Sequence, residues 1–242
     1  MRLGPRPRLA AVRRCALLKA GVCATIECRM KSVDESLFPI LLKLRAKQCV
    51  VVGAGKIAAA KAAGLVTSGA RVVVIGPRAD DWIQSQARAG KLIWRRRRFV
   101  AADVEHAFLV VAATSSNATN ETVFQVCVER GVLCNVVDDP EHCDFFYPAV
   151  VRRGPLLIAI STSGRSPALA RRLRIELERQ FGSEYRAWVE QVGEMRQELR
   201  GRNLSAAERR RLLAQIASRK SFERFLQQKA TKRQPSKRKG RR

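Results

Sequence analysis

Residues 49–58 read CVVVGAGKIA and contain the residue types needed to hold a dinucleotide pyrophosphate. A short apolar run breaks into Gly-x-Gly-x-x-Ala and continues into an alanine-rich stretch, which is the pattern of a strand, a tight turn and a helix. Gly53 permits the sharp turn, Gly55 lets the backbone approach a phosphate, and N–H groups at the helix start face the anion. A plain structural turn is the alternative, but a second apolar run at residues 71–75 follows about one helix later. We therefore predict a dinucleotide-binding turn.

Asp138 is a candidate for acid–base chemistry. It follows the apolar run LCNVV, and in a doubly wound sheet the carboxyl end of such a strand faces the ligand crevice. A carboxylate there can orient a substrate or accept a proton. An Asp shortly before Pro140 can equally cap a loop, so position alone leaves both interpretations open. Thr114 follows the run FLVVAA and is similarly either a contact for the middle of the cofactor or the start of a turn.

The end of the second predicted strand bears on which dinucleotide binds. Dinucleotide-binding domains normally carry an acid here for the adenosine ribose. This chain reads Ile75-Gly76-Pro77-Arg78 instead. The missing acid weakens a standard NAD assignment, and Arg78 could stack on adenine or attract a 2′-phosphate. The sequence therefore leaves NADP open beside NAD.

Residues 161–167, STSGRSP, form a hydroxyl-rich loop with an arginine at a predicted helix start. Ser166 is a natural N-cap, and Pro167 suits the first helical position. Ser163 and Arg165 could bind substrate carboxylates or a phosphate, because a helix N-terminus attracts anions. Capping alone is the alternative function of this loop.

No metal site is predicted. The only histidines are His106 and His142, and His142 beside Cys143 lacks the spacing of a ligand pair. The seven cysteines show no CxxC pair, and several lie in apolar runs where reduced Cys packs as a small hydrophobe. Reduced thiols favour a cytoplasmic location. The four arginines at residues 95–98 are interpreted as a solvent-facing strand edge.

The chain has 242 residues and a formal net charge of +26, much of it near the two ends. Eight Lys and Arg residues fall in residues 1–31 and eight in residues 229–242, and we expect both segments to be disordered. The leader is either such a disordered or untranslated extension or a cleaved targeting peptide, although Lys19 interrupts its apolar run.

No nucleic-acid-binding motif lies between the basic ends, which argues against a specific nucleic-acid partner. No stretch reaches the ~20 apolar residues that cross a membrane.

Apolar runs alternate with helical patterns, which predicts a parallel sheet covered on both faces. We expect strands at residues 49–52, 71–75, 92–95, 108–113, 133–137 and 156–161, and helices at 56–68, 82–89, 167–181, 184–200 and 206–227, with another ending near 130. The fold class is α/β: a Rossmann-type doubly wound parallel sheet, then a strand–helix dimerisation element and a small C-terminal helical domain. The expected boundaries are 32–147, 148–181 and 182–228.

Taken together, these segments resemble the precorrin-2 dehydrogenase family, which includes the amino-terminal part of siroheme synthase. The resemblance covers residues 37–227 and is carried by the glycine turn, by FLVVAATSSNATN and by CNVVDDPEHCDFFYPAVVRRGPLLIAISTSGRSPALARRLR. General Rossmann domains share the glycine turn but lack NVVD followed by an aromatic-Pro segment and the STSG-x-SP helix start.

The resemblance implies a homodimeric, NAD-dependent oxidoreductase that converts precorrin-2 to sirohydrochlorin on the route to siroheme. It places the functional aspartate of the family on Asp138 and the cofactor contacts on Lys56, Ile57, Pro77 and Arg78. A hydride passes from the macrocycle to the nicotinamide, and Asp138 either takes the proton or positions the substrate.

The resemblance also bears on the substrate and on regulation. Precorrin-2 is rich in carboxylates, so a basic crevice would stabilise it, and we place Asn135, Ser163 and Arg165 among its contacts. A serine that is phosphorylated in some members corresponds to Thr162. Some members also insert iron into sirohydrochlorin, and iron insertion by this chain stays open. The alternative function is a non-catalytic module that senses NAD.

Overall fold

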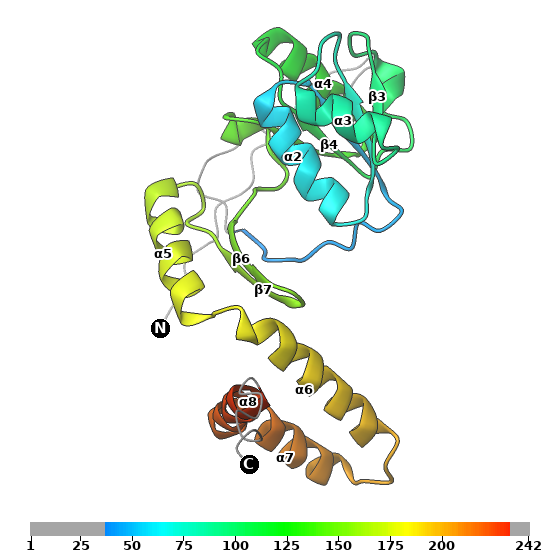
Figure 1. The fold of residues 1–242 in the computed structure, drawn as a ribbon. Coiled ribbons are helices and arrows are strands. Elements are labelled where there is room, and N and C mark those ends of the chain that lie inside the picture. Colours follow the sequence, from blue (N-terminus) through cyan, green and yellow to red (C-terminus); the bar gives the residue numbers. More distant parts are fainter. Residues whose placement is uncertain (1–36, 233–242) are drawn as a thin grey trace, which may run out of the picture. The chain divides into compact units, whose positions relative to one another are not determined.

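The computed structural model describes residues 37–232, which divide between Phe146 and Tyr147 into two compact units. The predicted leader at residues 1–31 and the tail beyond residue 232 lie outside the described residues. The first unit contains a parallel sheet with its helices, and the second contains a hairpin followed by helices (Figure 1).

The first unit is built on a five-stranded parallel sheet with the strand order β3-β2-β1-β4-β5. The strands are β1 (Gln48–Val52), β2 (Arg71–Ile75), β3 (Ile93–Arg95), β4 (Leu109–Ala112) and β5 (Leu133–Val136). These bounds lie close to the predicted ones, and the α/β fold class is confirmed. The direction of winding reverses between β1 and β4, and ligands bind at such a switch point in doubly wound sheets.

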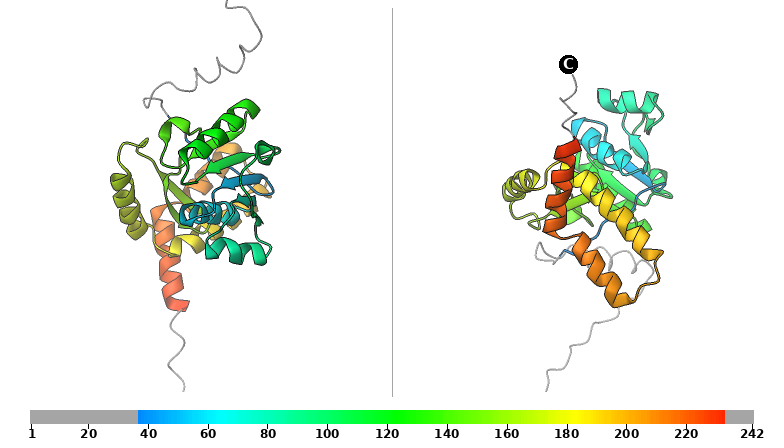
Figure 2. Two further views of the ribbon diagram at one scale, coloured as in Figure 1. Left: turned by 90° about the horizontal axis from the view of Figure 1, so that it is seen from above. Right: turned by 60° about the horizontal axis from the view of Figure 1, so that its bottom comes forward.

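Helices cover both faces of this sheet, which Figure 1 and Figure 2 show from different directions. α2 (Lys56–Thr67) and α3 (Asp81–Arg88) pack on one face, and α4 (Asn117–Arg130) packs on the other. In β1, Val51 belongs to the first of these cores and Val50 to the second, and both are fully buried. Because both faces are covered, the strands are apolar throughout instead of alternating.

Two short 3₁₀ helices, η1 (Ala101–Val104) and η2 (Pro140–His142), have no counterpart among the predicted elements. They lie in the connections that follow β3 and β5. Both connections leave the carboxyl edge of the sheet, so both bear on the site described below.

The second unit opens with an antiparallel hairpin of β6 (Ala149–Arg153) and β7 (Leu156–Ile160), which turns at Gly154 with a φ of +59°. β7 agrees with the predicted strand, whereas β6 is missing from the prediction. The apolar part of β6 stops before two arginines, which makes it too short to signal a strand. α5 (Pro167–Gln180) follows and is capped by the Ser166 hydroxyl as predicted.

The C-terminal helices are α6 (Glu184–Arg200), α7 (Ala206–Ile216) and α8 (Arg219–Lys232). The single helix predicted over residues 206–227 is wrong, because the Ser218 hydroxyl accepts a hydrogen bond from the Ser221 N–H at 3.3 Å and starts a new helix. α8 also continues past the predicted tail boundary at residue 229. Rings from α6 and α8 pack together in an aromatic cluster of Tyr185, Trp188, Phe222 and Phe225.

Candidate functional site

The turn after β1 has the geometry that a pyrophosphate requires. Gly53 has a φ of +103°, and a Cβ added there would lie 2.2 Å from the carbonyl oxygen of Ala113, so only glycine fits. A Cβ added at Gly55 meets nothing within 4 Å, so the backbone at the start of α2 faces open space. Within the described residues no side chain caps this helix. The free N–H groups therefore fit an anionic ligand.

A cavity of about 1000 Å³ opens beside this turn at the carboxyl edge of the sheet. The turns after β1, β2, β4 and β5 all contribute to its lining. The structure thus brings together all the predicted cofactor-binding residues and the predicted catalytic aspartate: Gly53, Gly55, Lys56, Ile57, Pro77, Arg78, Thr114 and Asp138. A cavity of this volume suits a large cofactor.

Asp138 is held in an unusual backbone conformation, with a φ of +62°. The next residue anchors the loop, because the Asp139 carboxylate lies 2.6 Å from Nδ1 of His142. Nε2 of His142 lies 3.2 Å from the Glu121 carboxylate on α4. The Cys143 thiol lies 3.1 Å from the carbonyl oxygens of both Val136 and Asp139 and can donate to either. These contacts fix the loop that carries Asp138.

Two ionisable groups next to this loop have shifted pKa values. Burial lowers the pKa of the Lys61 ammonium on α2, while the nearby charges of Asp138 and Cys143 act in the opposite direction. Burial raises the pKa of the Cys143 thiol to about 11. The thiol is therefore protonated at neutral pH and remains a hydrogen-bond donor.

Thr114 has features of both roles that the sequence left open, a cofactor contact and the start of a turn. It lines the cavity, yet its hydroxyl donates to Oδ1 of Asn120 at 2.7 Å and its N–H reaches the same oxygen at 3.2 Å. The neighbouring Ser116 caps α4 by accepting from the Thr119 N–H at 3.2 Å. Thr114 is thus a turn residue whose hydroxyl already has a protein partner.

The three predicted substrate contacts divide between the two units. Asn135 is 6% exposed, and its Nδ2 donates to the Phe145 carbonyl at 2.8 Å, so it holds the loop after β5 against the strand and does not line the cavity. Ser163 and Arg165 belong to the second unit, in the loop before α5. Ser163 has a φ of +50°, and its N–H donates to the Ser161 hydroxyl at 3.1 Å.

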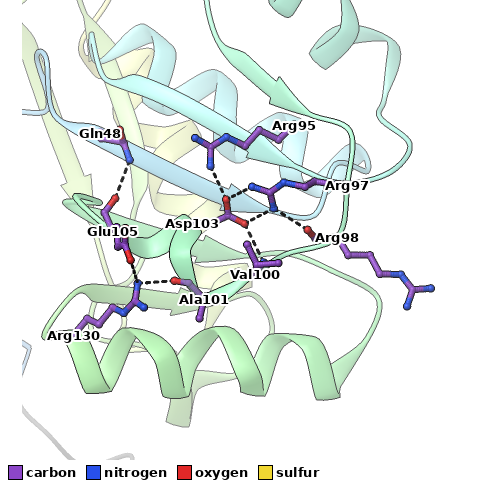
Figure 3. A network of polar contacts seen from close by, with 9 residues as sticks. All are labelled: Gln48, Arg95, Arg97, Arg98, Val100, Ala101, Asp103, Glu105 and Arg130. Carbon is purple, nitrogen blue, oxygen red and sulfur yellow. Dashed lines mark hydrogen bonds and ion pairs between the residues drawn. The ribbon is translucent and has the colours of Figure 1, made fainter.

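The arginine run is where the sequence analysis missed functional structure. β3 is an edge strand and Arg95 to Arg98 are exposed, as predicted, but Arg95 and Arg97 also bind the Asp103 carboxylate at 2.6 Å (Figure 3). The Asp103 side chain is only 1% exposed. Arg97 and Arg98 also line the cavity. The sequence did contain one relevant signal: Asp103 follows the four arginines by a few residues and does not begin any predicted helix.

Asp103 is ionised in this environment. Burial raises the pKa of its carboxyl, but hydrogen bonds from Arg97, the Val100 N–H and Arg95, together with the charge of Arg97, outweigh burial and hold that pKa below its usual value. Asp103 therefore acts as a fixed negative charge that organises the segment after β3.

Neither a metal cluster nor a membrane span is found in the part of the chain that the structure describes. No group of three or more His, Cys, Asp and Glu side chains among residues 37–232 could hold a metal ion. Over the same residues no helix is long and apolar enough to cross a membrane. The four cysteines in this range are free thiols.

Comparison with known proteins matches most of the first unit and part of the second to described families. Residues 40–149 match a family described as NAD(P)-binding, and residues 153–180 match one described as the central part of a sirohaem biosynthesis protein. These segments meet near the division between the two units. The predicted dinucleotide-binding domain is thereby confirmed.

Individual relatives agree with this assignment. Siroheme synthase from Nitrosococcus oceani is 39% identical over 163 residues, which are 63% of this chain and 35% of that protein. Siroheme synthase from Photorhabdus laumondii is 36% identical over 172 residues, 71% of this chain and 37% of that protein. The chain thus spans little more than a third of these curated relatives. The solved structure of SirC, precorrin-2 dehydrogenase, matches with a TM-score of 0.67 and 28% identity, covering 79% of this chain and 98% of that one.

Proposed function

We propose that this chain acts as a member of the precorrin-2 dehydrogenase family and oxidises precorrin-2 to sirohydrochlorin with NAD, a step towards siroheme. The observation that carries the proposal is that the glycine turn and Asp138 line the same cavity. A dinucleotide held by the turn and a substrate held near Asp138 would then meet at the switch point of the sheet.

Each part of the cavity has a role in this proposal. The turn after β1 would bind the pyrophosphate, because Gly53 and Gly55 leave backbone N–H groups facing open space. NAD, when bound, supplies the hydride acceptor. Asp138 would orient the substrate and accept the proton that leaves the macrocycle. The Lys61 ammonium, which interacts electrostatically with Asp138, adds positive charge on this side of the site.

The charge of the lining supports an anionic substrate and cofactor. Lys56, Arg78, Arg97 and Arg98 line the cavity, and Asp138 is the only carboxylate among its described lining residues. A tetrapyrrole rich in carboxylates would be attracted to such a surface. We keep Ser163 and Arg165 as proposed substrate contacts, and we propose that Asn135 acts by holding the loop that carries Asp138.

We further propose that the protein is a cytoplasmic homodimer in which residues 148–181 form the dimerisation element. A two-stranded sheet such as β6–β7 is marginally stable alone, and pairing with a second copy would complete it. The buried free thiols suit a reducing compartment. The boundaries of 32–147 for the Rossmann domain and 182–228 for the helical domain belong to the same proposal.

The experiment is anaerobic incubation of the full chain with precorrin-2 and NAD, followed by NADH absorbance and the spectrum of sirohydrochlorin. We expect product from the wild type and a rate lowered by about 10²-fold or more in Asp138→Asn, with the Kd for NAD changed less than about twofold. Asp81→Asn is the matched control, since it removes one carboxylate from an exposed position at the start of α3.

Three outcomes contradict parts of the proposal. Full activity in Asp138→Asn would make this residue a loop cap only. Equal losses in Asp138→Asn and Asp81→Asn would indicate a general effect of charge. Tight binding of NAD without oxidation of precorrin-2 would favour the non-catalytic module that senses NAD.

A further inference from the structure

The last two helices carry a large excess of positive charge. Residues 206–232, which include α7 and α8, hold eight Lys and Arg residues and only two Glu residues. Both carboxylates already have partners, because Glu208 accepts a hydrogen bond from the Ser205 hydroxyl at 2.6 Å and Glu223 lies 3.1 Å from Arg219. Most of the cations are therefore not neutralised within these helices. The sequence continues with six more Lys and Arg residues and no acid in residues 233–242.

In α7 the positive charge lies opposite the packed face of the helix. α7 contacts α6, its neighbour in Figure 1. Leu212, Leu213 and Ile216 are half-buried and recur at the spacing of one helical face. Arg210 and Arg211 are exposed. The two arginines therefore project from the outer face of α7 into solvent.

α8 is divided in the same way. The rings of Phe222 and Phe225 lie 5.6 and 5.2 Å from the ring of Trp188 on α6, whereas Lys220 and Arg224 are exposed. Four exposed cations of α7 and α8 form no side-chain hydrogen bond or ion pair within residues 37–232: Arg210, Arg211, Lys220 and Arg224. The outer faces of both helices thus offer positive charges to an anionic partner.

The aromatic packing narrows the choice of partner. A helix that binds a lipid surface needs an apolar face free to enter the lipid. The apolar face of α8 is already used, because Phe225 is 6% exposed and packs on Trp188. Proteins that bind single-stranded nucleic acid stack its bases on aromatic side chains. Phe222 and Phe225 are the only aromatic residues in residues 206–232, and both lie in the aromatic cluster. A partner that presents phosphates alone, without lipid or unpaired bases, fits best.

We propose that the outer faces of α7 and α8 bind duplex DNA through its phosphates, independently of the base sequence. Arginine suits this partner, because its planar guanidinium binds a phosphate through two hydrogen bonds, and five of the eight cations are arginines. Duplex DNA carries one negative charge per ~1.7 Å of its axis, which suits closely spaced cations. Phosphate contacts carry no sequence information and need no recognition motif, so the proposal agrees with the sequence analysis.

The length of α8 sets the size of the expected effect. Its 14 residues span about 21 Å, which is roughly six base pairs of duplex DNA. We expect about five phosphates to contact lysine or arginine side chains, and release of their counterions gives a slope of about −4.5 for the logarithm of the binding constant against the logarithm of the salt concentration. Raising KCl from about 50 to about 200 mM should therefore weaken binding by about 500-fold.

The test measures the Kd of a fluorescent duplex of about 20 base pairs by anisotropy on the full chain. Two duplexes of different base sequence should bind equally. Two double variants, Arg210→Gln with Arg211→Gln and Lys220→Gln with Arg224→Gln, should each weaken binding by about tenfold or more. Each should also reduce the steepness of the salt dependence by about 2, because two phosphate contacts are lost.

Arg88→Gln with Lys91→Gln is the matched control, since it removes two exposed positive charges from the first unit. We expect it to change the Kd less than about twofold at about 0.1 M salt. An equal loss in this control would overturn the proposal, because only overall charge would matter. Tighter binding to a single strand of the same length or to phosphatidylglycerol vesicles would overturn it too. Polyglutamate that competes as well as unlabelled duplex would point to an acidic protein instead and would also reject DNA as the partner.

This inference and the proposed reaction fail separately. None of Arg210, Arg211, Lys220 and Arg224 lines the cavity, so both double variants should keep the rate of precorrin-2 oxidation. Oxidation of precorrin-2 without DNA binding would reject the inference and leave the reaction standing, and DNA binding without oxidation would do the reverse. Circular dichroism of each variant checks that the fold is retained, which is expected because all four residues are exposed.

Discussion

The contact between Asp103 and the arginine run yields a prediction whose size can be worked out from the structure. Asp103→Asn keeps the shape of the side chain but removes its charge. The wild-type carboxylate accepts hydrogen bonds from Arg95 at 2.6 Å, from Arg97 at 2.6 and 2.7 Å and from the Val100 N–H at 3.0 Å. All of these bonds converge on one buried acceptor group in Figure 3.

The expected loss of stability is about 2 kcal/mol. Breaking a fully buried ion pair costs ~3–5 kcal/mol, but that figure assumes that the remaining charge is buried. Here the Arg95 and Arg97 side chains are 44% and 42% exposed, so water can solvate them once the carboxylate is gone. Because the amide oxygen of the substituted asparagine still accepts and water solvates the released guanidinium groups, the net cost is about that of one charge-assisted hydrogen bond, ~1.5–3 kcal/mol.

Urea denaturation followed by tryptophan fluorescence measures this loss. The chain has three tryptophans, and Trp188→Phe leaves Trp82 and Trp94, both in the first unit. In the Trp188→Phe background the tryptophan fluorescence therefore reports the unfolding of the first unit, which contains Asp103. Glu105→Gln is the control, because the Glu105 carboxylate is 59% exposed and lies 3.8 Å from its partner Arg130. We expect this control to change the free energy of unfolding by less than about 0.5 kcal/mol.

The dependence on pH provides an independent check. The pKa of Asp103 is lowered in the folded protein, so its contribution is fully present above the unfolded value of about 3.9 and is lost as the pH falls towards the folded value. The difference between wild type and Asp103→Asn should therefore be constant near pH 6 to 7 and shrink below about pH 4. A difference that is absent at pH 7, or that grows in acid, would refute the reasoning.

Two further predictions concern the turn and the loop at the carboxyl edge. Gly53→Ala should destabilise the first unit by about 2 kcal/mol or more in the same denaturation assay, because its Cβ would clash with Ala113, whereas Gly55→Ala should keep the stability and weaken dinucleotide binding. His142→Gln should lower kcat by about tenfold with little change in the KM for NAD, because it removes the 2.6 Å contact with Asp139 that orders the loop. An unchanged kcat in His142→Gln, or a stable Gly53→Ala, would contradict these accounts.

The sequence predicted the parallel sheet well because each strand is a short run of Val and similar residues between clear turn signals. Gly53 and Gly131 mark such turns, and the structure gives both a positive φ. The prediction failed where the signal was weaker than the tertiary contacts. β6 carries too few apolar residues to be recognised, and the break before α8 depends on the Ser218 cap, which lies inside an otherwise continuous helical pattern.

The residues that line the cavity could likewise be predicted only in part. Arg78 and Thr114 were identified from their positions after strands, because a parallel sheet places strand ends at one edge, whereas Lys56 was identified from the family resemblance. Arg97 and Arg98 were missed because the order of this segment depends on Asp103 in η1, which binds Arg97, and on Arg97, which donates to the Arg98 carbonyl. A run of four arginines has no periodicity that separates a solvated face from an ordered one, and only the position of the buried acceptor decides between them.

The backbone at Asp138 offers a physical argument for function that the sequence alone did not contain. A φ of +62° is uncommon for a residue other than glycine, although Asp tolerates it better than most. Such a conformation persists where the surroundings fix it, and here they do: the Cys134 N–H donates to Asp144 at 2.8 Å and Asn135 bridges to Cys143. A residue that only capped a loop would not need this support from both sides. The energetic cost of this backbone conformation is explained if the loop must hold the Asp138 carboxylate towards the cavity in a fixed direction. This supports the catalytic role proposed for Asp138.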